Sequence, residues 1–488
     1  MKNVIIIGGG FSSIAASCYL SKAGFNVTIY EKNKDLGGRA RQLKRDGFTF
    51  DMGPTWYWMP DVFERFFLDF NKKPSDYYLL DKLSPAYSVY FDVLDYITIL
   101  DNLDEISNSF ETIEEGSSQK LKSFIANAKS NYDIAIKDLV YKPGESFLEL
   151  VTPKTIAKLN QFFGNVSNDV KAIFKNKRLQ SILEFPVLFL GAKPSNTPSF
   201  YNFMNYADFG LGTWHPKGGM FEVVNGMIKL AKSLGVTIKT EAPIDEIRVI
   251  DNKVSGVIVN GEFIESEIVL SGADYVHTEK LLPISNRQYS DEYWDKKTFA
   301  PSSLLFYVGF DKKLKNIEHH TLFFDTDFDV HAESIYDEPK WPEKPLFYAS
   351  FPSKTDHTFA PEGKEAATFL IPLAPGIQDT DEIRHKYFKK IIKRLEELTN
   401  QKVSDTILFV ESFGVNNFVD DYNSYKGNAY GLANTIFQTA FLRPKLKSKT
   451  VEGLYFTGQL TVPGPGVPPA LISGKLSAGL ISKYELKR

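Results

Sequence analysis

The first thirty residues carry the hydrophobic pattern of a β-α-β unit. Asn3–Ile7 (NVIII) is a short β-branched run that predicts a buried strand, and three glycines follow it at once. Apolar residues at helical spacing predict a helix over Phe11–Lys22, and residues 26–31 (NVTIYE) predict a second strand. A helix between two such strands is typical of the crossover in a parallel sheet. The chain therefore opens with the geometry of a nucleotide-binding fold.

Residues 61–190 change to a polar and weakly helical pattern. Apolar residues recur at three- and four-residue spacing over 121–150 and 153–189, which predicts helices. Residues 220–234 have a clear amphipathic helical pattern, and alternating strand patterns follow over 236–273. We expect a helical insertion and then a β-rich return to the first sheet.

A second set of strand patterns predicts another sheet, with strands at 302–309, 321–324, 345–351 and 367–373. A helical pattern at 382–399 follows it. The chain closes with a strand pattern at 451–457, a turn rich in glycine and proline, and a helical pattern at 470–484.

The composition is that of a folded protein without a bias toward nucleic acid. Of the 488 residues, 43% are apolar and 24% charged, and the formal net charge is −3. Cys18 is the only cysteine, which excludes internal disulfides and multi-cysteine metal sites and suits a reducing cytosol. No apolar run reaches the ~18 residues of a membrane span, and the first run is too short for a signal peptide. We expect a cytoplasmic protein, and its 14% aromatic residues supply a core or line a site for an apolar ligand.

The glycine loop after the first strand predicts a dinucleotide site. Residues 8–13 (GGGFSS) match G-x-G-x-x-G with Ser13 in the place of the third glycine. Such a loop lets a pyrophosphate approach the backbone at a helix N-terminus, although glycines also end strands for structural reasons. Glu31 ends the second strand, where a carboxylate can bind both ribose hydroxyls. This combination indicates a dinucleotide and leaves NAD and FAD open.

Two further motifs favour FAD. Residues 36–39 (LGGR) and 50–55 (FDMGPT) resemble the FAD-binding pattern of flavin amine oxidases and carotenoid desaturases. Arg39 would offer its guanidinium to the pyrophosphate.

Later motifs resemble the bacterial phytoene desaturase family, which includes hydroxycarotenoid 3,4-desaturases. The matching segments run in family order: 214–220 (WHPKGGM), 271–278 (SGADYVHT), 319–321 (HHT), 352–363, 425–427 with 438–444 (QTAFLRP), and 454–479. Four positions depart from the family pattern: Gly272 replaces an asparagine, Gln459 and Leu460 follow Gly458, and Pro469 replaces a glycine. Pro468 and Pro469 suit the first turn of a helix but remove two backbone donors, which puts donation to a flavin by these two nitrogens in doubt.

The resemblance implies an α/β fold. Its parts are a Rossmann-like FAD-binding domain of the glutathione-reductase and amine-oxidase kind, a mixed-sheet substrate domain and a helical lid. The implied boundaries are 1–80 with 212–285 and 450–488 for FAD, 286–449 for substrate, and 81–211 for a lid that associates with a membrane. The implied FAD ligands are Gly8, Gly10, Phe11, Ser12, Ser13, Glu31, Lys32, Gly38, Arg39, Gly53, Pro54, Thr55, Ile244, Gly458, Gln459, Val467 and Pro468.

The same resemblance implies an FAD-dependent carotenoid desaturase of carotenoid biosynthesis. It would introduce C=C bonds into an apolar polyene by hydride transfer to flavin, acting on a 1'-hydroxycarotenoid at its 3,4 bond or on phytoene. Quinone or oxygen would accept the electrons, and the protein would contact a membrane peripherally. The alternatives are a flavin amine oxidase-like enzyme, a carotenoid isomerase, a non-catalytic flavin or lipid escort protein and, more weakly, an NAD dehydrogenase. Neither the oligomeric state nor any catalytic side chain is predicted.

The histidines do not predict a metal site or an acid–base pair. For His215, His277 and His320 we expect structural hydrogen bonds, and of the adjacent His319 and His320 we expect at most one to face inward. Asp274 is predicted to cap the helix that follows it. Residues 56–59 (WYWM) and 185–190 are either membrane-contact segments or core.

Overall fold

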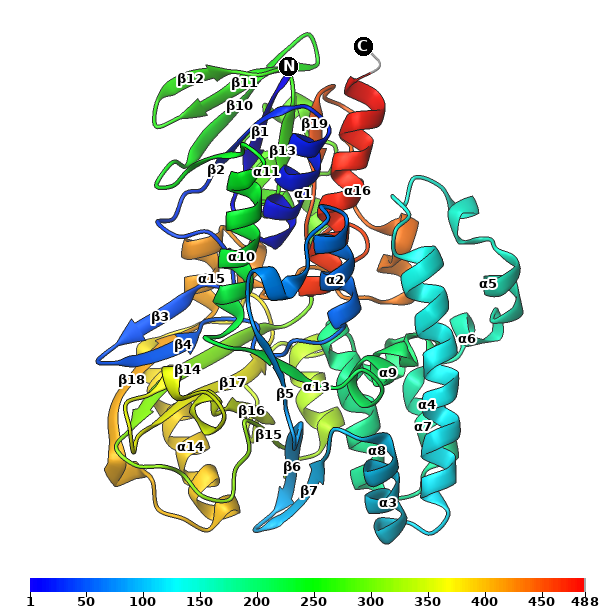
Figure 1. Ribbon diagram of the computed structural model, residues 1–488, viewed down its shortest axis with the longest axis vertical. Helices are drawn as coiled ribbons and strands as arrows, with labels where there is room; N and C mark the ends of the chain where they lie inside the picture. The colour runs from blue at the N-terminus through cyan, green and yellow to red at the C-terminus, as the bar shows by residue number, and fades with distance from the viewer. Residues whose placement is uncertain (487–488) are drawn as a thin grey trace.

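The computed structural model describes residues 1–486, apart from the side chains of 189, 190 and 436. Its first layer is a five-stranded parallel sheet in the order β19-β13-β1-β2-β9 (Figure 1). The strands are β1 (Asn3–Ile7), β2 (Asn26–Tyr30), β9 (Thr237–Lys239), β13 (Val269–Ser271) and β19 (Leu454–Phe456). Segments from the start, middle and end of the chain thus form one sheet, which confirms the predicted Rossmann-like fold.

The alternation of side chains along β1 explains why both faces of this sheet are covered. Val4 and Ile6 pack in the core with α1 (Phe11–Lys22), α10 (Met220–Ser233) and α16 (Val467–Glu485). Ile5 and Ile7 pack on the other face with the antiparallel strands β10 (Ile244–Ile250), β11 (Lys253–Val259) and β12 (Glu262–Glu265) and with α11 (Tyr275–Lys280). A strand that is buried on both faces reads as a continuous apolar run, as NVIII does.

The second layer is a mixed seven-stranded sheet in the order β18-β14-β17-β16-β15-β6-β7. Its strands are β18 (Ile407–Phe413), β14 (Ser302–Phe310), β17 (Glu365–Leu373), β16 (Phe347–Ser350), β15 (His320–Phe323), β6 (Tyr87–Asp92) and β7 (Asp95–Ile99). Only the β15–β6 pair of these is parallel. Along β14, Leu304 and Phe306 pack against α14 (Asp381–Thr399), whereas Ser303 and Leu305 face a cavity.

The expectation that 61–190 form a helical insertion is wrong for 80–99. This range forms β5 (Leu80–Lys82), β6 and β7, because its aromatic and β-branched residues (YSVYFD and DYITI) suit a sheet. We propose that 1–80, 212–285 and 450–488 form one unit, 286–449 a second and 81–211 a third, with 87–99 moved to the second unit, whose sheet they extend.

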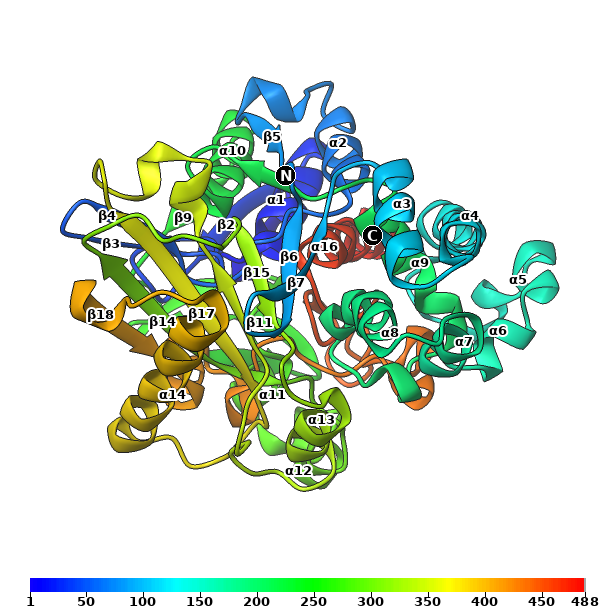
Figure 2. The same ribbon diagram turned by 90° about the horizontal axis from the view of Figure 1, so that it is seen from below.

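The remaining helices of the insertion lie together on one side of both sheets (Figures 1 and 2). They are α3 (Leu103–Ile113), α4 (Ser117–Ile134), α5 (Pro153–Ala157), α6 (Asn160–Phe163), α7 (Val166–Ile173), α8 (Lys177–Glu184) and α9 (Phe203–Phe209). Elsewhere the chain forms α2 (Pro60–Leu68), α12 (Asp291–Asp295), α13 (Phe328–Tyr336), α15 (Val415–Tyr422), β3 (Gln42–Arg45), β4 (Phe48–Asp51) and β8 (Trp214–Pro216). Among residues 1–486, no helix combines the length and apolar character that a bilayer span requires.

Candidate functional site

One cavity of about 910 Å³ extends from the glycine loop after β1 to the space between the seven-stranded sheet and the helical insertion. Most of its wall is apolar, and polar side chains such as Glu31, Arg39 and Asp274 line the part next to the glycine loop. Such a size and lining are usual for sites that hold small organic ligands. The cavity has two parts, a nucleotide end at the parallel sheet and an apolar chamber at the second sheet.

The nucleotide end is shaped by glycines at the start of α1. Gly8 has φ +83°, and a Cβ on it would lie 3.3 Å from the backbone nitrogen of Ala273. A Cβ on Gly10 would meet no atom of the described part of the chain within 4 Å, which leaves clear space at the helix N-terminus. Within the described residues no side chain caps α1, so its first N–H groups are available to an anion.

Glu31 and Lys32 form the side of the nucleotide end. The Glu31 carboxylate is 5% exposed and accepts the Gly9 N–H at 2.7 Å and the Asn33 N–H at 2.8 Å. The Lys32 ammonium donates to the backbone oxygen of Asp420 at 2.6 Å. The Glu31 bonds fix the carboxylate beside the glycine loop, where the ribose of a dinucleotide is expected.

Arg39 lines the nucleotide end of the cavity. Its Nη2 donates to Ser424 Oγ at 3.1 Å and to the backbone oxygen of Asn428 at 3.3 Å. Nε is buried and finds no partner within residues 1–486. Burial lowers the pKa of Arg39, although the charge of Asp274 opposes this. A buried cation with an unused donor on the wall of a cavity fits an anionic group such as a pyrophosphate.

The structure brings almost all of the predicted FAD ligands to this cavity. Those that line it are Gly8, Gly10, Phe11, Ser12, Glu31, Lys32, Gly38, Arg39, Gly53, Pro54, Thr55, Ile244, Gly458, Gln459, Val467 and Pro468. Ser13, which belongs to α1, does not line it and is fully buried. The role of each residue as an FAD ligand remains a prediction.

Two departures from the family motifs compensate each other. A Cβ on Gly272 would lie 2.0 Å from Ser13 Oγ, so a side chain at 272 is incompatible with the serine as placed. Ser13 thus occupies space that glycine at 272 leaves free. The third position of the glycine loop is therefore a packing position in this chain.

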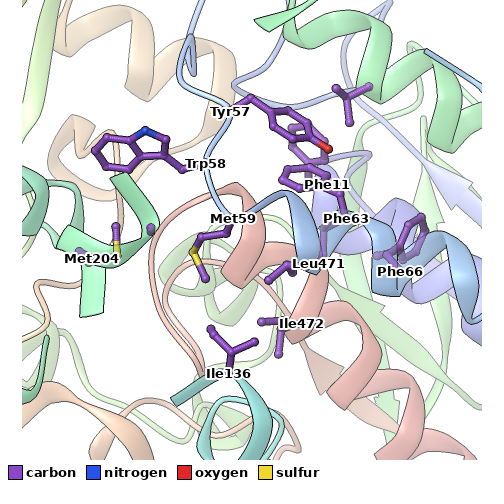
Figure 3. Packing of buried hydrophobic residues seen from close by; sticks show 14 of the residues in the cluster. Phe11, Tyr57, Trp58, Met59, Phe63, Phe66, Ile136, Met204, Leu471 and Ile472 are labelled. Carbon is purple, nitrogen blue, oxygen red and sulfur yellow. The ribbon is translucent and has the colours of Figure 1, made fainter. Parts of the chain in front are cut away.

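Aromatic and aliphatic side chains from distant segments form the chamber. Figure 3 shows Trp58, Met59, Met204 and Ile136 gathered near the start of α16, and all four line the cavity. They were not predicted as site residues. The WYWM run at 56–59 was the available signal, because so many large rings in a row suit the wall of an apolar site.

The interpretation of 56–59 and 185–190 as membrane-contact segments is not supported. Tyr57, Trp58 and Met59 are buried, and so are Phe185 and Val187. Trp58 and Phe185 line the chamber, so these two side chains face the interior.

His215, His319 and His320 form a buried cluster behind the chamber wall. The expectation that at most one of His319 and His320 faces inward is wrong, since they are 2% and 0% exposed. All of β15 is buried, and His319 just before it bonds through Nδ1 to Thr355 Oγ1 at 2.6 Å. Nε2 of His215 lies 3.0 Å from a carboxylate oxygen of Asp356.

Two other predicted roles can be compared with the structure. Asp274 accepts the N–H groups of Val276 at 3.0 Å and His277 at 3.4 Å, which confirms it as the cap of α11. His277 lines the nucleotide end, and burial lowers its pKa to about 4, with smaller effects of Lys32 and Lys280. No cluster of metal-ligating side chains occurs within the part of the chain that is described.

Asp208 on α9 is a buried acid next to the chamber. It accepts a hydrogen bond from Tyr87 Oη at 2.7 Å and is 3% exposed. Burial raises its pKa to about 7, and the Tyr87 bond opposes this only in part. Tyr87 in turn packs on Trp56 and Phe185, so Asp208 supports the chamber wall from behind.

Comparison with known proteins agrees with this geometry. Residues 14–482 match the family described as flavin containing amine oxidoreductase. The chain is 42% identical over 486 residues to carotenoid 3,4-desaturase of Haloarcula japonica, covering 98% of this chain and 97% of that protein. It is 33% identical over 496 residues to a 4,4'-diapophytoene desaturase of Staphylococcus aureus, covering 97% of each. An oxidoreductase structure from Methanosarcina mazei shares the fold, with a TM-score of 0.64 and 16% identity over 97% of this chain and 99% of that chain.

Proposed function

The chain belongs to the carotenoid desaturases of the flavin-containing amine oxidoreductase family, and from this we propose that it is an FAD-dependent enzyme that introduces C=C bonds into an apolar polyene. The observation that carries the proposal is the continuity of the cavity. The end that fits a dinucleotide and the chamber that fits an apolar ligand belong to one cavity. A flavin and a polyene bound in that cavity would therefore touch.

The residues of the nucleotide end fit FAD. The free N–H groups of α1 and the unused donor of Arg39 suit its pyrophosphate, and the fixed carboxylate of Glu31 suits a ribose. When bound, FAD supplies the hydride acceptor that no side chain can provide. Thr55, Gly458 and Gln459 line the same cavity, and we expect the flavin ring to lie beside them.

The chamber would position the polyene and exclude water. Trp58, Phe185 and Met204 give it apolar walls that offer shape rather than hydrogen bonds. A substrate held against the flavin in one register gains rate through proximity and orientation. Ser303 Oγ is a buried hydroxyl on this wall without a partner within residues 1–486, and it could hold an end-group hydroxyl.

Two substrate classes stay open, a hydroxylated carotenoid oxidised at its 3,4 bond and a hydrocarbon such as phytoene. Each purified carotenoid should be fed to the FAD-loaded protein in the presence of membranes, with products identified by absorption and mass. We expect products that have lost two hydrogens for each new double bond. Products of unchanged mass would indicate an isomerase, and oxidation of amines would indicate an oxidase.

We also propose peripheral contact with a membrane through a different surface from the one first expected. Phe147, Leu148, Phe163 and Phe437 are large apolar side chains that are 57% to 80% exposed, and Phe163 also lines the cavity. Such a surface at the cavity mouth would let a polyene enter directly from lipid. Replacing Leu148 and Phe163 with serine should reduce co-sedimentation with liposomes without loss of bound flavin.

Quinone or oxygen would reoxidise the flavin after each desaturation.

A further inference from the structure

Three segments that are far apart in the sequence join in one hydrogen-bond chain at the chamber wall. Thr55 follows the FDMGP motif, Tyr348 lies on β16, and His320 begins β15. Thr55 Oγ1 lies 2.8 Å from Tyr348 Oη, and Tyr348 Oη lies 2.6 Å from His320 Nδ1. Thr55 and Tyr348 line the cavity, whereas His320 lies behind them and is fully buried. The chain therefore leads from the cavity surface into the protein.

The proposed reaction needs a place for a proton. Dehydrogenation removes one hydrogen from each of two adjacent carbons, and a flavin takes one of them as a hydride. The other must leave as a proton, and its bonding electrons form the new C=C bond. The apolar side chains of the chamber wall, such as Trp58, Phe185 and Met204, offer no acceptor for it. The Thr55–Tyr348 pair is a polar exception, and it adjoins the segment predicted to touch the flavin.

We propose, on the basis of the proposed function, that Thr55, Tyr348 and His320 form a proton relay for the desaturation step. The proton that leaves the substrate carbon binds a lone pair of the Thr55–Tyr348 hydroxyl pair as the hydride leaves for the flavin. Tyr348 then passes its own proton to Nδ1 of His320, which becomes an imidazolium. The proton later returns through the same hydroxyls and is released when the flavin is reoxidised, so the relay ends each turnover neutral. Thr55 and Tyr348 are catalytic residues in this account, and His320 acts through Tyr348.

The surroundings of His320 suit a transient acceptor. Burial and, to a smaller extent, His215 keep the pKa of His320 well below its usual range, so the ring is neutral and has a lone pair to offer. Its ring stacks on Trp56 with a centroid distance of 4.0 Å and an interplanar angle of 12°. The face of an indole stabilises a cation, which lowers the cost of the brief imidazolium. An allylic cation beside a polyene is a strong acid, so a weak base is sufficient.

A purely structural role would place the same hydrogen bonds here, because they also join β15, β16 and the loop after β4. The relay requires two properties that a structural role does not require. Nδ1 of His320 must accept the hydrogen bond from Tyr348, and the hydroxyl protons must move during catalysis.

The first test uses protein without flavin. The chain contains seven histidines, which can be labelled with ¹⁵N and observed by NMR. The ¹⁵N spectra should show that the His320 ring is neutral near pH 7 and that its Nδ1 is unprotonated and accepts a hydrogen bond. In Tyr348→Phe the Nδ1 signal should shift to that of a nitrogen without a hydrogen bond. A proton on Nδ1 in the wild type would mean that the bond points the wrong way, and it would overturn the relay.

The second test follows formation of the longer polyene by its absorbance in one anaerobic turnover of flavin-loaded protein. Tyr348→Phe should slow this step on the order of 10²-fold, with unchanged polyene binding. Heavy water should slow the wild type but not Tyr348→Phe. His320→Phe keeps a flat ring against Trp56 but removes the proton acceptor. The rate of polyene formation and the effect of heavy water on that rate should therefore both fall. Tyr90→Phe is the matched control, since it removes a tyrosine hydroxyl from β6 of the same sheet, away from the cavity, and should behave as wild type.

The outcomes separate the relay from the proposed function. Wild-type protein that forms no new polyene would sink the desaturase assignment itself. The relay alone would be contradicted if the wild-type protein formed product and Tyr348→Phe formed it at the same rate and with the same isotope effect.

Discussion

The nucleotide end and the apolar chamber are parts of one cavity, yet the chain builds them in different ways. At the nucleotide end, backbone conformation matters most: Gly8 needs a positive φ, and the N-terminus of α1 needs clear space. In the chamber, side-chain shape matters most, and Trp58, Ile136 and Met204 come from separate segments. Residues that need a special backbone conformation occur in the sequence as motifs of fixed spacing. A wall assembled by tertiary packing can be recognised in the sequence only from the amino-acid composition. Changes at the two parts should therefore have separable effects.

The largest effect should come from the buried acid behind the chamber. The folded state holds the Asp208 proton up to a pKa of about 7, whereas an unfolded aspartate releases it near pH ~4. The free energy of unfolding should therefore fall as pH rises between these values, by up to about 4 kcal/mol. Asp208→Asn should remove this fall and make the protein more stable than wild type at pH 8.

Urea unfolding at pH 5 and pH 8 measures this difference. Asp104→Asn, at an exposed position on α3, should keep the wild-type slope. If Asp208→Asn keeps it as well, the acid does not carry the pH dependence.

At the nucleotide end, Gly8→Val should weaken FAD binding on the order of 10²-fold, because φ +83° and the contact with Ala273 exclude a side chain. Flavin retained after gel filtration measures the loss. Gly24→Val is the matched control, since Gly24 also has a positive φ of +92° but open space around it. It should cost stability and keep the flavin, and equal flavin loss in both variants would refute the specific role of Gly8.

A smaller effect on the same end is expected from Arg39→Gln. Losing one charge-assisted bond to the pyrophosphate should weaken FAD binding about tenfold. Arg41→Gln removes a nearby arginine that pairs with Asp421 and does not line the cavity, so FAD binding should change less than about twofold. Titration of the flavin-free protein by fluorescence distinguishes the two variants, and similar constants for both would count against Arg39 as a ligand.

The smallest effect should be confined to the chamber. Met204→Trp adds volume to its wall, and we expect about tenfold weaker binding of the longest polyenes, a smaller change for short ones, and unchanged flavin content. Loss of flavin in this variant would show that the two parts are not independent.

Motif spacing predicted the nucleotide end well. The β-α-β unit, the cap at Asp274 and the glycine loop all follow from local rules that act within a few residues. Local rules did not predict that Tyr87 lies in a strand of a sheet rather than in a helical insertion. The strand that pairs with β6, which contains Tyr87, is β15, and it lies more than 200 residues away in the sequence. They also gave no sign that Ser13 packs against Gly272, which is equally remote in the sequence.

The chamber and the relay could not be predicted in the same way. Thr55, Tyr348 and His320 each lie in a recognisable segment, but nothing in their spacing shows that the three side chains meet. Their contact depends on the register of β15 against β16, which pairs His320 with Ser350, and on the position of the loop after β4. Such contacts are set by the packing of whole layers.

Anaerobic titration of the flavin-loaded protein tests most directly whether flavin and polyene meet in one cavity. Each equivalent of a partly saturated carotenoid should bleach one flavin at about 450 nm and produce one additional conjugated double bond, because the oxidant and the substrate are in contact. A flavin that stays yellow while every tested carotenoid binds with its spectrum unchanged would contradict the account.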